Sequence, residues 1–119
     1  MDVVYHKNVF HQKPNQENYP YASSAQIFHS NQLFISSEKL ETGLRASAPN
    51  FHKEIDEIIY IVEGELMAHE DNDARILRKG DFVCFHANSN KKHYLENQSG
   101  RVAEFLIFRK SLSVSDVQY

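Results

Sequence analysis

The residue types that could carry out chemistry are concentrated in two stretches of this 119-residue chain, residues 50–65 and residues 80–97. In the first stretch, His52 and Glu57 flank a short charged turn that leads into an apolar, β-branched run. In the second stretch, a glycine, an apolar run and a polar turn lead to His93. Two imidazoles and a carboxylate at strand ends can form the polar mouth of a barrel that binds a small ligand. A buried Glu57 could alternatively act as a general base. The two stretches therefore predict one site, although they do not identify its reaction.

The period of two along a strand determines which side chains would lie below this mouth. Residues at alternate positions share a face, so the apolar neighbours of Glu57 and His93 are expected to line the cavity. Two further residues near the same strand ends are candidate accessory groups. The predicted lining consists of Ile59, Ile61, Leu95, Asn97, Tyr60 and His86.

Short β-rich runs separated by turn residues make up most of the chain after residue 25. Turn signals recur roughly every 8 to 12 residues, and no long window favours a helical period. The predicted fold is therefore all-β, a single small antiparallel β-barrel or jelly roll over residues 26–110. Residues 1–25 are predicted to form an N-terminal arm that supplies an edge strand or a dimer contact. Residues 111–119 form a polar C-terminal tail that is expected to fray or to pack on a neighbour.

Composition and charge limit the partners. The formal net charge of -3 argues against a nucleic-acid or anionic-membrane partner. No stretch approaches the roughly 18 apolar residues of a membrane helix, and the N-terminus lacks the apolar core of a signal peptide. Cys84 is the only cysteine, so an internal disulfide is impossible and a reducing compartment suits the chain. We therefore expect a cytoplasmic protein whose partner is a small molecule, with neither nucleic acid nor membrane involved.

The first stretch resembles the first sequence motif of the cupin superfamily. Glu57, six residues and then Gly64 fit the end of that motif, and His52 stands in the place of its second histidine. Asn50 occupies the place of its first histidine. The upstream Gly43 also fits, with one residue more than usual before Asn50.

The second stretch resembles the second cupin motif. Gly80, His93 and Asn97 fill their places, whereas His86 stands where proline is usual. The resemblance covers about residues 33–108. It implies the cupin-like double-stranded β-helix, which is a form of jelly roll.

Carried over by position, the resemblance implies one divalent first-row transition metal, such as Fe, Mn, Ni or Zn. His52, Glu57 and His93 match its expected ligands. Asn50 would be a weaker fourth ligand, because an amide oxygen is a neutral and poorer donor than an imidazole. Two histidines and one carboxylate nevertheless suffice for a facial triad that leaves coordination positions open.

The resemblance leaves two functions open. The first is a small metal-dependent enzyme acting on an oxygenated metabolite, such as a keto acid, hydroxy acid or sugar derivative. Cupin enzymes include dioxygenases, decarboxylases, isomerases, epimerases and lyases, so the fold does not select the reaction. The second is a non-catalytic cupin, a sensor or accessory protein that binds a small molecule at a degenerate metal site. Cupins often dimerise, so a homodimer is expected in either case.

Overall fold

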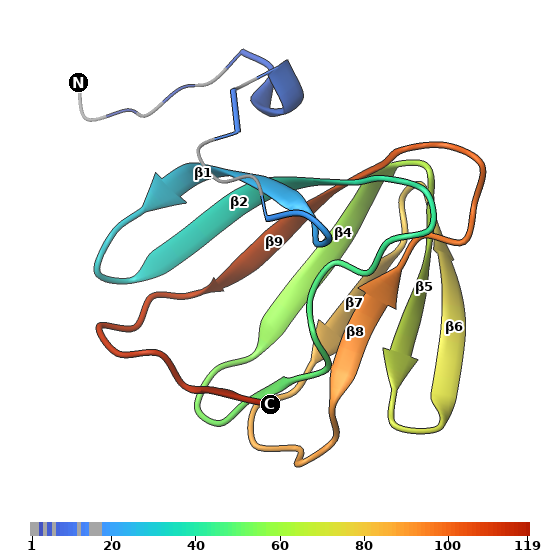
Figure 1. Ribbon diagram of the computed structural model, residues 1–119. Helices are drawn as coiled ribbons and strands as arrows, with labels where there is room; N and C mark the ends of the chain where they lie inside the picture. The colour runs from blue at the N-terminus through green and yellow to red at the C-terminus, as the bar shows by residue number, and fades with distance from the viewer. Residues whose placement is uncertain (1–2, 4, 6, 12, 15–17) are drawn as a thin grey trace.

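The computed structural model describes residues 3, 5, 7–11, 13–14 and 18–119 (Figure 1). Within these residues it consists of short strands and one 3₁₀ turn. The elements are η1 (Val9–His11), β1 (Ser23–His29), β2 (Leu33–Leu40), β3 (Phe51–His52), β4 (Glu57–Glu63), β5 (Glu65–Glu70), β6 (Asp73–Arg78), β7 (Phe82–Phe85), β8 (His93–Glu96), β9 (Ala103–Lys110) and β10 (Val117–Gln118).

The strands form three antiparallel sheets. A five-stranded sheet has the order β1-β2-β9-β4-β7, and a three-stranded sheet has the order β6-β5-β8. The two-residue strands β10 and β3 form a small third sheet. Neighbours such as β2 and β9 are far apart in sequence, which is the crossover pattern of a jelly roll (Figure 1). The predicted all-β jelly roll is confirmed.

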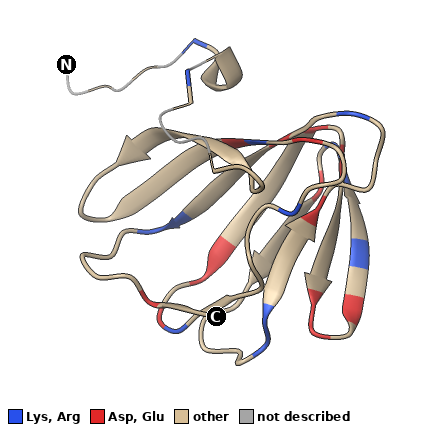
Figure 2. Cartoon of the chain, viewed as in Figure 1, with Lys and Arg blue, Asp and Glu red and all other residues tan. Residues whose placement is uncertain are grey.

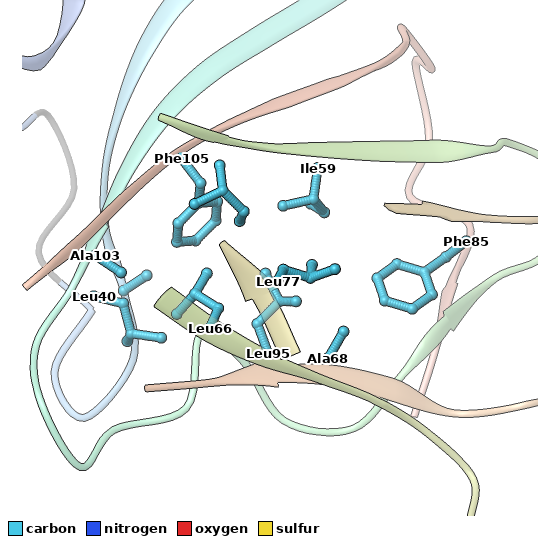
Figure 3. Close-up of a cluster of buried hydrophobic side chains, with 11 residues drawn as sticks. Leu40, Ile59, Leu66, Ala68, Leu77, Phe85, Leu95, Ala103 and Phe105 are labelled. Atoms are coloured by element: carbon cyan, nitrogen blue, oxygen red, sulfur yellow. The ribbon is translucent and has the colours of Figure 1, made fainter. Parts of the chain in front are cut away.

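The core lies between the two larger sheets (Figure 3). Phe105 and Ile59 enter it from the five-stranded sheet, and Leu66 and Leu95 enter it from the three-stranded sheet. Phe105 is fully buried and Ile59 is 1% exposed. On β4, Ile59 alternates with Tyr60, which is 41% exposed on the outer face. The period of two therefore separates the core from the surface as the sequence predicts.

Gly64 forms the turn that passes the chain from β4 in one sheet to β5 in the other. Its φ is +87°, in the region that favours glycine. A Cβ at this position would lie 3.0 Å from the Cα of Ala103 and from the carbonyl oxygen of Val102. The motif glycine is therefore required both by its backbone conformation and by the close approach of β9.

Both ends of the chain contribute strands to the sheets. β1 begins at Ser23, inside the predicted arm, and is an edge strand of the five-stranded sheet. Residues 1–2, 4, 6, 12 and 15–17 of the arm lie outside the described residues. The tail folds back onto the barrel through pairing of β10 with β3. In the part of the chain described, no helix has the length and apolar character that crossing a membrane requires.

Candidate metal centre

Three strand ends bring His52, Glu57 and His93 together at one end of the barrel. His52 ends β3, Glu57 begins β4 and His93 begins β8. The turn between β3 and β4 returns Glu57 to the side of His52. The backbones of Asn50 and His93 exchange two hydrogen bonds, from Asn50 N to His93 O at 3.0 Å and from His93 N to Asn50 O at 2.7 Å. This bridge connects the two motifs, so the predicted convergence of the three side chains is present.

The carboxylate of Glu57 lies between the two imidazoles. His52 Nε2 lies 3.1 Å from Glu57 Oε2, and His93 Nε2 lies 3.6 Å from Glu57 Oε1. A metal held at about 2.0 to 2.2 Å by each donor keeps neighbouring donors roughly 3.0 to 3.5 Å apart. The two separations therefore suit a shared cation. The two histidines face different oxygens, however, and the three side chains do not offer a set of single donor atoms all within 4.8 Å of one another. A cation would have to draw the imidazoles closer together.

Asp116 on the C-terminal segment fixes the orientation of His52. Its Oδ1 lies 2.7 Å from His52 Nδ1, and its Oδ2 accepts hydrogen bonds from the backbone N–H groups of Glu54 and Ile55. With Nδ1 donating to this carboxylate, Nε2 points toward Glu57 and donates its proton to the Glu57 carboxylate. A cation bound at the site would take the place of that proton. A carboxylate behind a metal-ligating imidazole is the usual arrangement in metalloproteins.

The charges of this group reinforce one another. Burial alone would raise the pKa of Glu57, but the hydrogen bond from His52 and the neighbouring imidazole of His93 lower it to about 2. Burial alone would lower the pKa of His52, but Glu57 and Asp116 outweigh this effect and raise it. Burial would likewise raise the pKa of Asp116, yet His52 and the Glu54 N–H lower it. Glu57 is therefore an anion at neutral pH, which is the form that binds a cation.

His93 is held by packing instead of by a second carboxylate. Its ring stacks on Phe85 with a centroid separation of 3.8 Å and an interplanar angle of 1°. Its Nδ1 is buried and has no hydrogen-bond partner among the described residues. The two imidazoles therefore differ in support: His52 has an acidic partner, whereas the aromatic face of Phe85 positions His93.

Asn50, the predicted weaker ligand, lines the same cavity and is 8% exposed. Its amide nitrogen donates to the carbonyl of Ala48 at 2.7 Å and to Ser47 Oγ at 3.1 Å. Both amide hydrogens are thereby used in hydrogen bonds to the loop that precedes β3. Only the carbonyl oxygen remains available as a donor to a cation, so ligation by Asn50 stays a prediction.

The cavity has a volume of about 630 Å³, within the range of small-molecule sites. It opens between the five-stranded sheet, the β8 side and the C-terminal segment. Of the predicted lining residues, Ile59 and Leu95 do line it.

The other four predicted lining residues do not line this cavity. Ile61 is fully buried in the core. Tyr60 points outward because it alternates with Ile59, and the side chain of His86 is 84% exposed. Asn97 is fully buried, and its amide nitrogen donates to the carbonyls of Leu40 and Arg101. Asn97 is thus a structural residue of the β8–β9 turn, and the lining prediction is corrected for all four.

Several cavity residues were missed by sequence reasoning. They are polar or aromatic side chains on the inner face of the sheet and on the C-terminal segment, namely Phe34, Ser36, Glu38, Arg109 and Asp116. The i, i+2 spacing of Phe34, Ser36 and Glu38 was a usable signal, since alternate residues of a strand share a face. No comparable local signal identified Asp116.

Glu38 is a second carboxyl group in the cavity. It accepts a hydrogen bond from Ser36 Oγ at 3.2 Å. Burial raises its pKa to about 8, and the charge of Glu57 acts in the same direction. At neutral pH the cavity therefore contains an ionised Glu57 and a protonated Glu38, a division that suits acid–base chemistry.

A separate cluster lies outside this cavity. Single donor atoms of Asp56, Cys84 and His86 lie within 4.8 Å of one another, and none of the three residues lines the cavity. Burial, with the charges of Asp56 and Glu57, raises the pKa of the Cys84 thiol. Because a thiolate is the metal-binding form of cysteine, this cluster is the poorer candidate.

Comparison with known proteins agrees with the fold. The comparison with curated proteins gave no match. Among solved structures, the chain is similar to a sugar phosphate isomerase of the cupin superfamily from Silicibacter pomeroyi DSS-3, with a TM-score of 0.73 and 26% identity. That match covers 78% of this chain but only 61% of the other chain.

Two other matches show the fold alone. One is KdgF from Halomonas sp., with a TM-score of 0.70, 19% identity and coverage of 82% of this chain and 86% of that chain. The other is the cupin domain of an XRE family transcriptional regulator from Enterobacter cloacae, with a TM-score of 0.66, 20% identity and coverage of 76% and 97%. The family profile described as "Cupin domain" matches residues 37–109, which is more than half of the chain. The chain therefore belongs to the cupin domain family.

Proposed function

We propose that the chain is a metal-binding cupin that acts as a small enzyme on an oxygenated metabolite at the mouth of its barrel. The substrate class is a keto acid, a hydroxy acid or a sugar derivative. The observation that carries this proposal is the convergence of two imidazole nitrogens on the Glu57 carboxylate. These donors suit one divalent first-row transition metal, because two histidines and a carboxylate are a common facial set for such ions.

The cavity residues have distinct roles in this proposal. A bound divalent cation would polarise a carbonyl or hydroxyl oxygen of the substrate as a Lewis acid. Asp116 keeps the Nδ1 proton of His52 in place, so that Nε2 offers its lone pair to the site. Glu38, protonated at neutral pH, can donate a hydrogen bond or a proton to a substrate oxygen within the same cavity.

The kind of substrate is better defined than the type of reaction. The similar structures include proteins described as a sugar phosphate isomerase and as a predicted oxalate decarboxylase. Both descriptions refer to small oxygen-rich anions. We extend that chemistry to this chain as part of the proposal, with isomerase, lyase, decarboxylase and dioxygenase reactions left open.

Elemental analysis tests the metal site. Protein purified without chelator or affinity tag should contain close to one divalent ion per chain. The variants His52→Ala and His93→Ala should lose it, since each removes one of the three donors. His86→Ala is the matched control, because His86 is exposed and belongs to the outer cluster.

Two results would count against the proposed site. One is metal-free protein whose melting temperature does not change on adding iron, zinc, manganese or nickel. The other is metal that persists in His52→Ala and His93→Ala but disappears in His86→Ala, which would place the ion at Asp56, Cys84 and His86.

A non-catalytic small-molecule binder is the second candidate. Asn50 in place of the first motif histidine favours it, because both amide hydrogens are committed to the loop and only a neutral oxygen remains. The similarity to a regulator's cupin domain is compatible with such a role. A protein that binds sugar acids or keto acids equally well with and without metal would support this candidate over the enzyme.

A further inference from the structure

Arg109 is the only Lys or Arg among the described residues that line the cavity. It lies on β9, where the strand register pairs it with Phe34 of β2 on one side and Glu57 of β4 on the other. Paired residues of neighbouring strands project from the same face of a sheet. Phe34, Arg109 and Glu57 therefore form a row across the mouth. Figure 2 shows the basic end of β9 beside the acidic start of β4.

The aromatic ring of Phe34 supports the guanidinium group of Arg109. The guanidinium carbon lies 4.2 Å from the centroid of the Phe34 ring. This cation–π contact occupies one face of the planar group and leaves its N–H edge available to a ligand. Phe34 thus positions Arg109 by stacking, as Phe85 positions His93.

No carboxylate among the described residues neutralises Arg109. The arginines Arg45, Arg78 and Arg101 each form an ion pair within 4.0 Å, but Arg109 does not. Glu57 is instead occupied by the two imidazoles. Glu38 interacts with Arg109 over a longer range, and its raised pKa leaves it uncharged at neutral pH. The cavity therefore has one uncompensated guanidinium.

The spacing allows one small molecule to reach both Arg109 and the candidate metal centre. Neighbouring strands lie about 4.8 Å apart, so Arg109 and Glu57 are one strand spacing apart in the same row. Ser36 and Glu38 line the cavity on the next strand, β2, and offer hydrogen bonds to hydroxyl groups. A molecule of a few carbon atoms with an anionic end and several hydroxyls matches this layout.

We propose that Arg109, stacked on Phe34, is an oxyanion subsite that binds the carboxylate or phosphate of a sugar acid or sugar phosphate. Planar bidentate recognition of an oxyanion is the interaction for which a guanidinium is best suited. The other end of the ligand then reaches His52, Glu57 and His93, and only this part of the inference rests on the proposed metal site. The inference names the substrate as an anionic sugar derivative.

Isothermal titration calorimetry on the protein as purified tests the subsite with three matched probes, D-glucuronate, D-glucose 6-phosphate and D-glucose. At least one anionic sugar should bind, and uncharged glucose should bind at least tenfold more weakly. Arg109→Gln should weaken binding of the anionic sugar by about tenfold to a hundredfold, which is the usual effect of removing a charged hydrogen-bond partner. Arg109→Lys should have an intermediate affinity, because lysine retains the positive charge but cannot form the two parallel hydrogen bonds of a guanidinium group.

Arg75→Gln is the control, since it removes an equal charge from an exposed position on β6 outside the cavity. Its affinities should equal those of the original protein. The glucuronate and glucose 6-phosphate arms show whether the subsite is built for carboxylate or for phosphate.

Metal content, measured on the same samples, separates this inference from the proposed function. Unchanged anion affinity in Arg109→Gln with metal present overturns the subsite and leaves the metal site intact. Anion binding that depends on Arg109 in protein without metal supports the subsite and contradicts the metal site. Failure of both anionic sugars to bind at millimolar concentration, or equal binding of glucose, also overturns the subsite.

Discussion

Glu38 and Glu57 share one cavity, yet their surroundings drive their ionisation in opposite directions. Glu57 faces two imidazoles, which lower its pKa to about 2. Glu38 has a hydroxyl, a distant guanidinium and the negative charge of Glu57 as neighbours, and burial raises its pKa to about 8. The identity of a side chain therefore does not determine its role here. The opposite charge states follow from what each carboxyl contacts.

The raised pKa of Glu38 predicts a pH-dependent effect of Glu38→Gln on stability. Between pH 4.5 and about 8 the unfolded chain releases the Glu38 proton while the folded chain retains it. The folded state thus binds more protons, so stability due to this group is present at low pH and is lost as pH rises through this window. Glutamine keeps an oxygen that can accept the Ser36 hydrogen bond but has no proton to lose. As pH rises through this window, the free energy of unfolding of Glu38→Gln should therefore increase relative to that of the original protein. The increase should be at most about 1.4 kcal/mol per pH unit.

Denaturant unfolding at pH 5 and at pH 8 measures this difference. Glu41→Gln serves as the control, because Glu41 is exposed and lies outside the cavity. A Glu38→Gln variant that is equally destabilised at both pH values would show that Glu38 is ionised throughout.

At the residue scale, the motif residues were predictable and their supporting partners were not. His52 and Glu57 were found because a turn between two strands brings their ends together, and His93 because the second motif repeats the scheme. Tyr60 was added as an accessory group although the period of two already placed it opposite Ile59. Asp116 lies 64 positions from His52, and no local pattern reports a contact over that distance.

At the scale of elements, β10 joins the C-terminal segment to the site. This two-residue strand pairs Val117 with His52 and Gln118 with Phe51. Asp116 immediately precedes it and hydrogen-bonds both the imidazole of His52 and the backbone of the next turn. The segment was predicted as a polar tail because two residues are too few to show a period of two. Its structure comes from backbone pairing with β3 and from the hydrogen bonds of Asp116, instead of from its own composition.

The role of this element predicts the effect of Asp116→Ala. Loss of the carboxylate removes the hydrogen bond from His52 and leaves the N–H groups of Glu54 and Ile55 without their acceptor. Stability should fall by about 1 to 3 kcal/mol, the usual penalty for unpaired buried groups. Metal affinity should fall by about tenfold to a hundredfold, because His52 loses its orienting partner.

Thermal unfolding and metal titration together measure these two effects. Ser113→Ala is the neighbouring control, since Ser113 is exposed and does not line the cavity. Original metal affinity in a destabilised Asp116→Ala protein would mean that β10 serves stability alone.

At the scale of the whole molecule, the sequence predicted the jelly roll because turn spacing and strand periodicity are properties that act along the entire chain. The position of the cavity followed from the fold, because the two motifs meet where β3, β4 and β8 begin or end. The polar inner wall of the cavity could not be predicted in this way, because Ser36, Glu38 and Arg109 lie outside both motifs in the sequence. Which strands become neighbours depends on the crossover order β2-β9-β4, and a single sequence does not report that order locally.

The outer face of the five-stranded sheet supports the expectation of a homodimer, which we propose here. Ile58 and Tyr60 on β4 are 39% and 41% exposed, and Phe82 on the edge strand β7 is 66% exposed. Tyr60 and Phe82 are cross-strand partners, so these side chains form one apolar surface next to a sheet edge. Apolar surface of this kind is commonly covered by a partner. A second copy that pairs at this face would bury it while leaving the cavity, on the opposite face of the sheet, open.

Light scattering at micromolar concentration should therefore give twice the chain mass of 13.8 kDa. Phe82→Lys should give the monomer mass, because it places a charge in the surface that the partner would bury. Ile76→Lys, at a 45% exposed position on β6 in the other sheet, should remain dimeric. A monomer mass for the original protein would refute the dimer. A dimer that survives Phe82→Lys would instead move the contact away from this face, with the N-terminal arm as the remaining predicted contact.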